Sequence, residues 1–274
     1  MSFSASTFSG VKFHFEYVPL KLKNYTKLFT WSERKDWKML DIGSGPGQLL
    51  LEVLSILPSN YKEIVCVDKE LDMVNHLNTV NKDSRISCRQ LNIETEALPA
   101  DLKGRFDFAF SSNCLMYLQN YRQVFSNVHE MLKPKGELFF IWGKICPIHE
   151  IYHKLSRSDK WSIYLEDFVD WKSYFNNESS VDLLERICKS ANLNILKVEE
   201  LNDLVIEYDD LQSHMDIFDS LDHISGRIPE SDLSEYKKDY HKLAMTYLTV
   251  EKIDNKQKKV KLHFPSVVLA ARKS

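Results

Sequence analysis

The sequence lacks the features that mark several protein classes. No run of about eighteen apolar residues is present, and residues 1–6 show neither the basic nor the apolar region of a signal peptide. The 36 Lys and Arg residues nearly balance the 39 Asp and Glu residues, and the formal net charge of -3 gives no electrostatic basis for a nucleic-acid partner. We therefore expect a cytoplasmic protein that binds no membrane and no nucleic acid.

Paired cysteines are also missing. None of the five cysteines stands in a C-x-x-C pair, and most have apolar neighbours, so we expect reduced thiols with neither a disulfide framework nor a metal site. No internal repeat or low-complexity tract is visible. The 274 residues are 43% hydrophobic and 27% charged. These values predict one globular domain, or one domain with a cap.

What the sequence does contain is a glycine-rich turn. Gly43, Gly45 and Gly47 stand at alternate positions directly after the apolar residues 39–42, and a helical pattern begins at Leu49. Glycine permits positive φ and close approach of a ligand, and a helix start presents free N–H groups. The segment predicts a strand, turn and helix that hold a nucleotide.

The spacing indicates which nucleotide. A dinucleotide-binding G-x-G-x-x-G motif would need a third glycine where Gln48 stands. Asp41 at the strand end would repel a pyrophosphate but attract an ammonium group. Asp-x-Gly-x-Gly-x-Gly resembles the loop of class I methyltransferases, in which Asp41, Gly43, Ser44, Gly45 and Gly47 would hold the methionine end of S-adenosylmethionine.

Strands and helices alternate from residue 38 to residue 142, which predicts a parallel sheet with right-handed crossovers. We expect a helix over residues 121–132 that ends at the stop signal Lys133-Pro134-Lys135-Gly136. The expected strands cover 39–42, 64–68, 86–92, 106–110 and 137–143, with residues 111–113 as a polar turn.

The flanking segments differ from this core. Residues 10–30 predict aromatic helical pieces interrupted by Pro19, serving as a lid or as ordinary packing. We expect an N-terminal lid over 1–35, a cofactor-binding core over 36–143, and helical cap insertions over 144–192 and 210–255. Residues 193–198 and 204–208 predict one long strand or a broken pair, and residues 259–272 a last strand.

Further cofactor contacts follow from strand ends. Asp68, with Lys69 after it, lies about twenty residues beyond the glycine turn, where an acid would bind ribose hydroxyls. Asn92 and Ile93 follow the third strand, where class I methyltransferases hold adenine; Asn92 can accept through its side-chain oxygen, or can simply form a turn. Two serines, Ser111 and Ser112, would end the fourth strand beside the sulfonium.

A narrower resemblance extends over nearly the whole chain. Phe-Ser-x-x-x-Leu-x-Tyr-Leu at 110–118 is similar to the fourth-strand motif of the insect juvenile hormone acid methyltransferases. Further segments that fit the same family are Tyr152-x-x-Leu155-Ser156, Lys160-Trp161, Leu165-Glu166, residues 208–211, Ile228-Pro229, Asp239-Tyr240 and residues 268–273. The resemblance implies a Rossmann-like α/β fold with a seven-stranded, mostly parallel sheet and a helical cap. It also implies methyl transfer from S-adenosylmethionine to the carboxylate of a farnesoid acid, with S-adenosylhomocysteine as product.

One departure leaves the acceptor open. The family has a His-Trp pair where this chain has Met116-Tyr117, and its early glutamine has no clear counterpart; His14 is the nearest polar residue. A carboxylate arrives ionised and needs hydrogen-bond donors, whereas a phenol with a pKa of ~10 needs a base. For a phenol, Tyr117 and His14 are the catalytic candidates, although a structural role is the more common one for any single histidine.

The expected acceptor pocket is apolar. Its candidate residues are Phe15, Met116, Tyr117, Trp142, His149, Tyr152, His153 and Trp161. We expect an O-methyltransferase of a small apolar acid or phenol that uses no metal, because Asp107 is the only hard oxygen ligand near the fourth strand. Two alternatives are an N-methyltransferase of a small amine, with Asp209 or Asp210 near the acceptor, and a protein that binds ligand without turnover. The sequence does not indicate an oligomeric state.

Overall fold

A seven-stranded sheet forms the centre of the molecule. The structure is a computed structural model that describes residues 14–30, 33–169, 179–202, 204–208, 210–252 and 258–274. The strand order is β3-β2-β1-β4-β5-β10-β6. The bounds are β1 Lys38–Ile42, β2 Glu63–Asp68, β3 Ile86–Gln90, β4 Phe106–Ser112, β5 Leu132–Gly143, β6 Leu193–Leu201 and β10 Ser266–Lys273.

The sheet is mostly parallel, as the sequence predicts. Each of β1 to β5 runs parallel to its neighbours, whereas β10 lies antiparallel to both β5 and β6. The order reverses at β1, where the chain steps from one half of the sheet to the other. In such sheets the ligand site lies beyond the carboxyl ends of the strands at this point.

Helices cover both faces of the sheet. The helices α2 (His14–Tyr25), α3 (Gln48–Leu54) and α4 (Leu71–Val80) pack on one face, and α5 (Tyr121–Met131) and α7 (Ser180–Ser190) pack on the other. Strand β5 shows the consequence of two covered faces. Phe140 and Trp142 point toward α5 and α7, while Phe139 and Ile141 point toward α2 and α3, and all four are fully buried.

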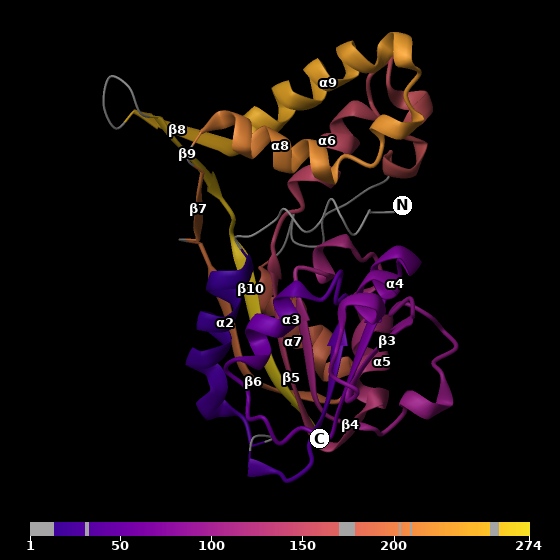
Figure 1. The fold of residues 1–274 in the computed structure, drawn as a ribbon, viewed down its shortest axis with the longest axis vertical. Helices are drawn as coiled ribbons and strands as arrows, with labels where there is room; N and C mark the ends of the chain where they lie inside the picture. The colour runs from indigo at the N-terminus through magenta and orange to yellow at the C-terminus, as the bar shows by residue number, and fades with distance from the viewer. Residues whose placement is uncertain (1–13, 31–32, 170–178, 203, 209, 253–257) are drawn as a thin grey trace.

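A cap lies above the carboxyl ends of the parallel strands (Figure 1). It contains α6 (Pro147–Leu155), α8 (Leu211–Leu221) and α9 (Glu230–Ala244) around a buried aromatic core. A second sheet of three antiparallel strands, in the order β7-β9-β8, joins the cap to the main sheet. Its bounds are β7 Val205–Tyr208, β8 Leu248–Lys252 and β9 Lys258–His263.

The second sheet is the main departure from the predicted elements. Residues 193–198 and 204–208 belong to two strands in different sheets, so the broken pair is correct. The predicted last strand is also two strands, because Pro265 offers no N–H to a ladder, and β9 and β10 pair with different sheets on either side of it. Residues 248–252, predicted as helix, form strand β8.

Two proline signals were misleading. Pro19 lies inside α2 rather than ending it, because Val18 and Leu22 are fully buried against the sheet, and this packing outweighs one missing hydrogen bond. Pro134 lies within β5, which begins at Leu132 directly after α5. Strand β4 likewise continues through Ser111 and Ser112, which were predicted as a turn.

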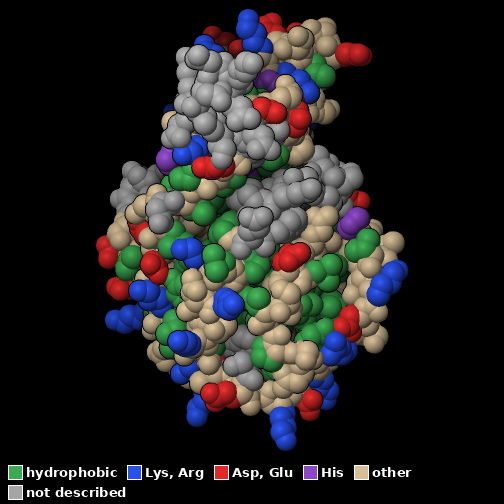
Figure 2. All heavy atoms as spheres, turned by 60° about the vertical axis from the view of Figure 1, so that its left-hand side comes forward, with side chains coloured by type: hydrophobic (Ala, Val, Ile, Leu, Met, Phe, Trp, Pro, Cys, Tyr) green, Lys and Arg blue, Asp and Glu red, His purple; other side chains and the backbone are tan. Residues whose placement is uncertain are grey.

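The surface carries both charges. On the face shown in Figure 2, acidic and basic side chains are interspersed around hydrophobic ones, so that face has no extended region of a single charge. Within the described ranges, every helix is too short or too polar to cross a bilayer.

Candidate functional site

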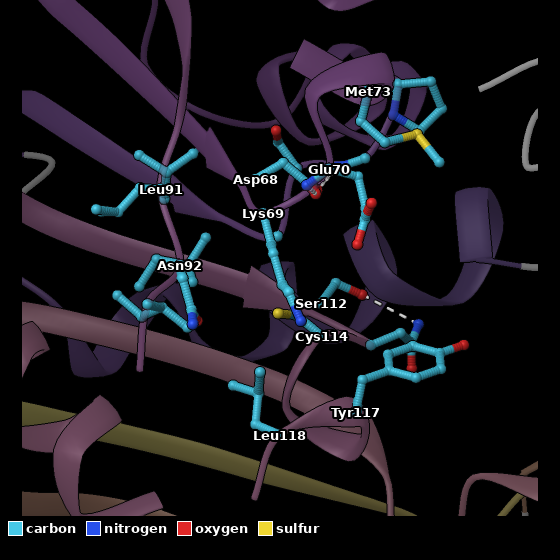
Figure 3. Close-up of a pocket in the computed structure, with 18 of the residues that line it drawn as sticks. Asp68, Lys69, Glu70, Met73, Leu91, Asn92, Ser112, Cys114, Tyr117 and Leu118 are labelled. Carbon is cyan, nitrogen blue, oxygen red and sulfur yellow. Dashed lines mark hydrogen bonds between the residues drawn. The ribbon is translucent and has the colours of Figure 1, made fainter. Parts of the chain in front are cut away.

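A cavity opens at the carboxyl ends of β1, β2, β3 and β4, below the cap. It is bounded by the glycine turn after β1, the segment after β2, the segment after β3 and the segment after β4 (Figure 3). Its lining residues are Ile42, Gly43, Ser44, Gly45, Pro46, Gln48, Leu49, Val67, Asp68, Lys69, Glu70, Met73, Leu91, Asn92, Ile93, Glu94, Ser112, Asn113, Cys114, Tyr117 and Leu118. Four separate strand ends therefore meet around one space.

The three glycines of the turn differ in the space around their Cα atoms. All three adopt positive φ, at 68°, 55° and 87° for Gly43, Gly45 and Gly47. A Cβ at Gly43 would come within 2.4 Å of Cys114, and one at Gly47 within 2.2 Å of Leu77, so packing excludes a side chain there. At Gly45 an added Cβ would meet no atom within 4 Å. Gly45 therefore lies where the backbone borders open space that a ligand can fill.

The N–H groups of this turn are bonded within the protein. Gly43 and Ser44 donate to Val67 O at 2.8 and 3.3 Å, Gly47 donates to Ser44 O at 3.2 Å, and Gly45 donates to Asp68 Oδ2 at 2.8 Å. A phosphate-binding loop needs such groups for the anion. The turn is therefore unsuited to a pyrophosphate and fits a cofactor without phosphate.

Asp68 ends β2 at the wall of the cavity. Its Oδ2 accepts from Gly45 N at 2.8 Å and its Oδ1 from Glu70 N at 2.9 Å, and each oxygen keeps a second lone pair for a ligand hydroxyl. Burial raises the pKa of Asp68 despite these bonds, and burial also raises the pKa of neighbouring Glu70. Figure 3 shows both side chains on one side of the cavity. This placement suits two adjacent ribose hydroxyls.

Asp41 lies beneath the turn and not in the cavity wall. It is only 3% exposed, and it pairs with Cys66 and Phe110 in the sheet register. Burial, and secondarily the charge of Asp68, raise the pKa of Asp41 to about 7. Asp41 is not among the residues that line the cavity. The predicted attraction of Asp41 for an ammonium group would therefore act from below the glycine turn and without direct contact.

The segment after β3 forms an apolar slot with a polar edge. Leu91, Ile93 and Leu118 line the cavity together with Asn92. Asn92 Oδ1 accepts from Glu94 N at 3.0 Å, and this Asx turn leaves one lone pair and the amide Nδ2 for a ligand. We still expect a flat base such as adenine to bind between these apolar side chains, with Asn92 at its edge, and this role stays a prediction.

The segment after β4 closes the cavity beside the cap. Ser112, Cys114 and Tyr117 lie together, below Asp68 and Glu70 in the view of Figure 3. The Tyr117 ring packs edge-on against His149 of α6, with ring centroids 5.2 Å apart, and its hydroxyl hydrogen-bonds the Cys146 thiol. Burial raises the pKa of Tyr117, so the phenol stays neutral.

Several predicted residues lie elsewhere. Ser111 is fully buried, and its hydroxyl donates to Ile42 O at 2.9 Å, so it faces the sheet interior and not the cavity. Gly47 packs on Leu77, and Trp142 lies in the core between the sheet and α5. None of these three is among the residues that line the cavity.

The predicted cap residues form the core of the cap. Tyr152 donates to Asp222 at 2.9 Å and Trp161 to Asp239 at 2.9 Å, and both rings are buried. His149 is fully buried and burial lowers its pKa to about 3, while His153 bonds the Phe168 carbonyl at 2.8 Å. These side chains hold the cap together and lie outside the cavity lining.

Three other predicted positions complete the comparison. Met116 packs where the main core, the cap core and the small sheet meet, and it is also outside the cavity lining. His14 and Phe15 begin α2, but their side chains lie outside the described part of the structure.

Sequence reasoning missed several residues of the cavity lining. Asn113, Cys114, Glu94 and Met73 line the cavity, and none was predicted. Asn113 had a possible signal: an Asn after a strand end tolerates positive φ, and its φ is indeed 51°. No sequence signal marked Cys114 as a lining residue, because a cysteine in an apolar segment is usually a core residue.

Together the lining fits S-adenosylmethionine. Gly45 leaves room for the methionine end, Asp68 offers acceptors for the ribose, and the Leu91–Ile93 segment offers an adenine slot. The far wall of Ser112, Asn113 and Tyr117 is left for the reacting methyl group and its acceptor.

The chain is similar to known methyltransferases. The methyltransferase domain family matches residues 40–138. The juvenile hormone acid O-methyltransferase of Drosophila melanogaster is 30% identical over 156 residues, which cover 56% of this chain and 52%, about half, of that protein. The Bombyx mori protein of the same name is 25% identical over 256 residues, or 92% of this chain and 90% of that protein.

A solved structure shows the same fold. Phosphoethanolamine N-methyltransferase 2 of Haemonchus contortus, in complex with S-adenosylmethionine, superposes with a TM-score of 0.52 at 17% identity, over 94% of this chain and 52% of that one. Fold, glycine turn and domain match lead to one conclusion. The chain has the class I methyltransferase fold, contains a methyltransferase domain over residues 40–138, and resembles the juvenile hormone acid methyltransferases.

Proposed function

We propose that the protein transfers a methyl group from S-adenosylmethionine to the carboxylate of an apolar acid. The observation that carries this proposal is the chemistry of the far wall. Among residues whose side chains are described there, Ser112, Asn113, Cys114 and Tyr117 are neutral, and none has a pKa suited to a base near neutral pH. An acceptor that binds already ionised needs no base, and a carboxylate meets this condition.

The nearby ionisable groups support the same choice. His149 contacts the Tyr117 ring, but burial lowers its pKa to about 3, so it is a poor base for a phenol. Glu94 Oε1 is engaged by the N–H groups of Gln119 and Asn120 at 2.8 and 2.6 Å. The Asp68 carboxylate is held by the N–H groups of Gly45 and Glu70 at the end of β2, where we expect the ribose hydroxyls.

The surroundings favour an apolar acceptor. Tyr117 and Met116 pack against the aromatic core of the cap, so an acceptor bound at the far wall lies beside apolar side chains. The two relatives from Drosophila melanogaster and Bombyx mori are both juvenile hormone acid O-methyltransferases, whose name specifies an acid as substrate. We therefore place farnesoid acids first among the acceptors, with a small phenol second.

The reaction asks little of the protein beyond placement. The cofactor supplies a methyl group on a sulfonium, which is reactive toward an oxygen anion held in line with it. The glycine turn and Asp68 fix the cofactor, the cap excludes water, and the far wall orients the acceptor oxygen.

A matched set of acceptors tests the proposal. The protein is incubated with labelled S-adenosylmethionine and, separately, farnesoic acid, farnesol, a small phenol and a small primary amine. We expect label in the methyl ester of the acid and not in an ether of farnesol, which has the same apolar chain without the carboxylate. Methylation of the phenol or amine in preference to the acid would contradict the proposal, and cofactor binding without methylation of any acceptor would indicate a binding protein.

A further inference from the structure

Three polar side chains from two distant segments meet at the far wall of the cavity. Asn113 Nδ2 donates to Ser112 Oγ at 3.2 Å, the bond drawn as a dashed line from Ser112 in Figure 3. Tyr17 of α2 lies on the other side of the Asn113 amide, with its hydroxyl 3.3 Å from Nδ2 and 3.5 Å from Oδ1. Asn113 is therefore held between a hydroxyl of its own strand and a phenol of the N-terminal helix.

The Asn113 backbone is held in an unusual conformation. Its φ of 51° is in the left-handed region, and its N–H donates to Ile141 O at 2.8 Å on the neighbouring strand. The side chain is only 8% exposed, yet it lines the cavity. Residues held in this region are concentrated at functional sites.

The Asn113 amide donates to both hydroxyls. Its Nδ2 donates to Ser112 Oγ and to the Tyr17 hydroxyl, and the Tyr17 hydroxyl can in turn donate to Asn113 Oδ1. Each hydroxyl carries one hydrogen. No residue in the described ranges accepts the hydrogen of Ser112, whose side chain lines the cavity and is partly exposed. The Ser112 hydroxyl is thus available to donate a hydrogen bond to a ligand.

We propose that Ser112 donates this hydrogen to the acceptor carboxylate, with Asn113 and Tyr17 as positioning residues. This inference rests on the proposed function. Ser112 would then be a neutral hydrogen-bond donor in a chain that has Met116-Tyr117 in place of a His-Trp pair. The residue that orients the acceptor oxygen would be Ser112 at the end of β4 and not Tyr117.

The chemical step balances without a proton transfer. One carboxylate oxygen accepts the Ser112 hydrogen bond, and the other attacks the methyl carbon. The new C–O bond forms as the S–C bond breaks, and the electron pair of the broken bond stays on sulfur. Ser112 keeps its hydrogen throughout, so its role is to hold the carboxylate in line.

The experiment compares two neighbouring serines. Ser112→Ala removes the proposed donor, Ser112→Thr restores a hydroxyl, and Ser111→Ala removes the buried hydroxyl that bonds Ile42 O. The measurements are the dissociation constant of S-adenosylmethionine by calorimetry and the single-turnover rate on farnesoic acid. We expect Ser112→Ala to lower the rate ~10- to 100-fold, the range for a hydrogen bond to a charged group. Cofactor affinity should stay unchanged, and both other variants should remain near the wild-type rate.

The role of Tyr17 as a positioning residue is tested by a separate kinetic measurement. Tyr17→Phe keeps the ring and removes only the hydroxyl, so we expect a ~3-fold fall in kcat with little change in KM or in cofactor affinity. In the Ser112→Ala background the same change should have no further effect, because Tyr17 acts through Ser112.

The outcomes separate the two proposals. If wild-type protein methylates farnesoic acid and Ser112→Ala does so equally fast, the inference is wrong and the proposed function stands. If wild-type protein binds the cofactor and methylates no acid, the proposed function is wrong and the inference is overturned with it. An equal loss in Ser111→Ala would also overturn the inference, because a general weakening of β4 would then explain both variants.

Discussion

The carboxylate of Asp68 and the backbone of Gly45 are joined by a 2.8 Å hydrogen bond from Gly45 N to Oδ2. The residue expected to bind the ribose therefore also fixes the conformation of the turn expected to hold the methionine end. Two contacts with the cofactor are coupled through one side chain, which makes Asp68 more important than a peripheral acceptor would be.

Replacing Asp68 should show this coupling. We expect Asp68→Ala to weaken S-adenosylmethionine binding ~10- to 150-fold, the range for hydrogen bonds to a charged group, and to speed hydrogen exchange at the Gly45 amide. Calorimetry and exchange measured by mass spectrometry check the two effects. Glu70→Ala is the control, because Glu70 lines the cavity without bonding the turn. If Glu70→Ala loses binding and Asp68→Ala does not, Glu70 is the ribose ligand.

The open space at Gly45 predicts a second result. Gly45→Val should abolish cofactor binding while the fold remains, since the new side chain would enter the cavity. Gly104→Val is the control variant. Gly104 has a φ of 58°, close to the 55° of Gly45, and an added Cβ there would also meet no atom within 4 Å, but Gly104 is not among the residues that line the cavity. Both should lose ~1–2 kcal/mol of stability from strain. Normal cofactor affinity in Gly45→Val would remove the turn from the site.

Asp41 predicts a dependence of stability on pH. Its pKa is raised from 3.8 in the unfolded chain to about 7 in the folded protein, so the folded state binds the proton more tightly between these values. The free energy of unfolding should therefore fall as pH rises through this window and level off above it. Between pH 5.5 and pH 8 the wild-type protein should lose roughly 2 kcal/mol more than Asp41→Asn does. Urea unfolding at the two pH values measures this; equal losses would mean that Asp41 stays ionised.

The acceptor chemistry predicts a flat pH profile. A carboxylate is ionised above pH ~5, so at saturating cofactor the single-turnover rate on farnesoic acid should change little from pH 6.5 to 9. Tyr117→Phe should keep the rate within ~3-fold, because the Tyr117 hydroxyl is already hydrogen-bonded with the Cys146 thiol. A rate that climbs tenfold per pH unit would instead indicate a proton removed before transfer, as a phenol requires.

A buried ion pair predicts a large effect on stability alone. Glu137 of β5 is fully buried and accepts from Arg272 Nε at 2.9 Å and Nη2 at 2.5 Å, and from Thr30 N at 2.9 Å. Arg272→Met would leave this carboxylate without its cation and should cost ~3–5 kcal/mol of folding stability. The exposed pair of Lys160 with Glu235 is the control, and Lys160→Met should cost at most about 1 kcal/mol. Similar melting temperatures for the two variants would contradict the expected difference.

The parts that sequence reasoning predicted well share a physical cause. Strands β1, β2 and β4 are buried on both faces, so each appears as a continuous apolar run, and the turn after β1 needs glycine at three positive φ values. The cofactor end of the cavity follows directly, because its residues stand at the ends of those strands.

The cap and the far wall were harder to predict. Apolar and aromatic residues occur throughout the cap, and pattern alone does not separate Tyr152, which bonds Asp222 in the cap core, from a residue that faces a ligand. Strands β7 and β9 pair with partners from distant segments, so no local signal shows that they form their own sheet. Asn113 depends on Tyr17, 96 residues earlier, and only the folded chain brings the two together.

The position of β10 has a consequence for the order of assembly. This strand follows every other element along the chain, yet it lies between β5 and β6 inside the sheet. During synthesis the five strands around the glycine turn can therefore pair while β6 has no neighbour to join. A growing chain would expose the unpaired edge of β5 until β10 arrives, so ribosome-bound intermediates should recruit chaperones at that strand and be released only once β10 has emerged.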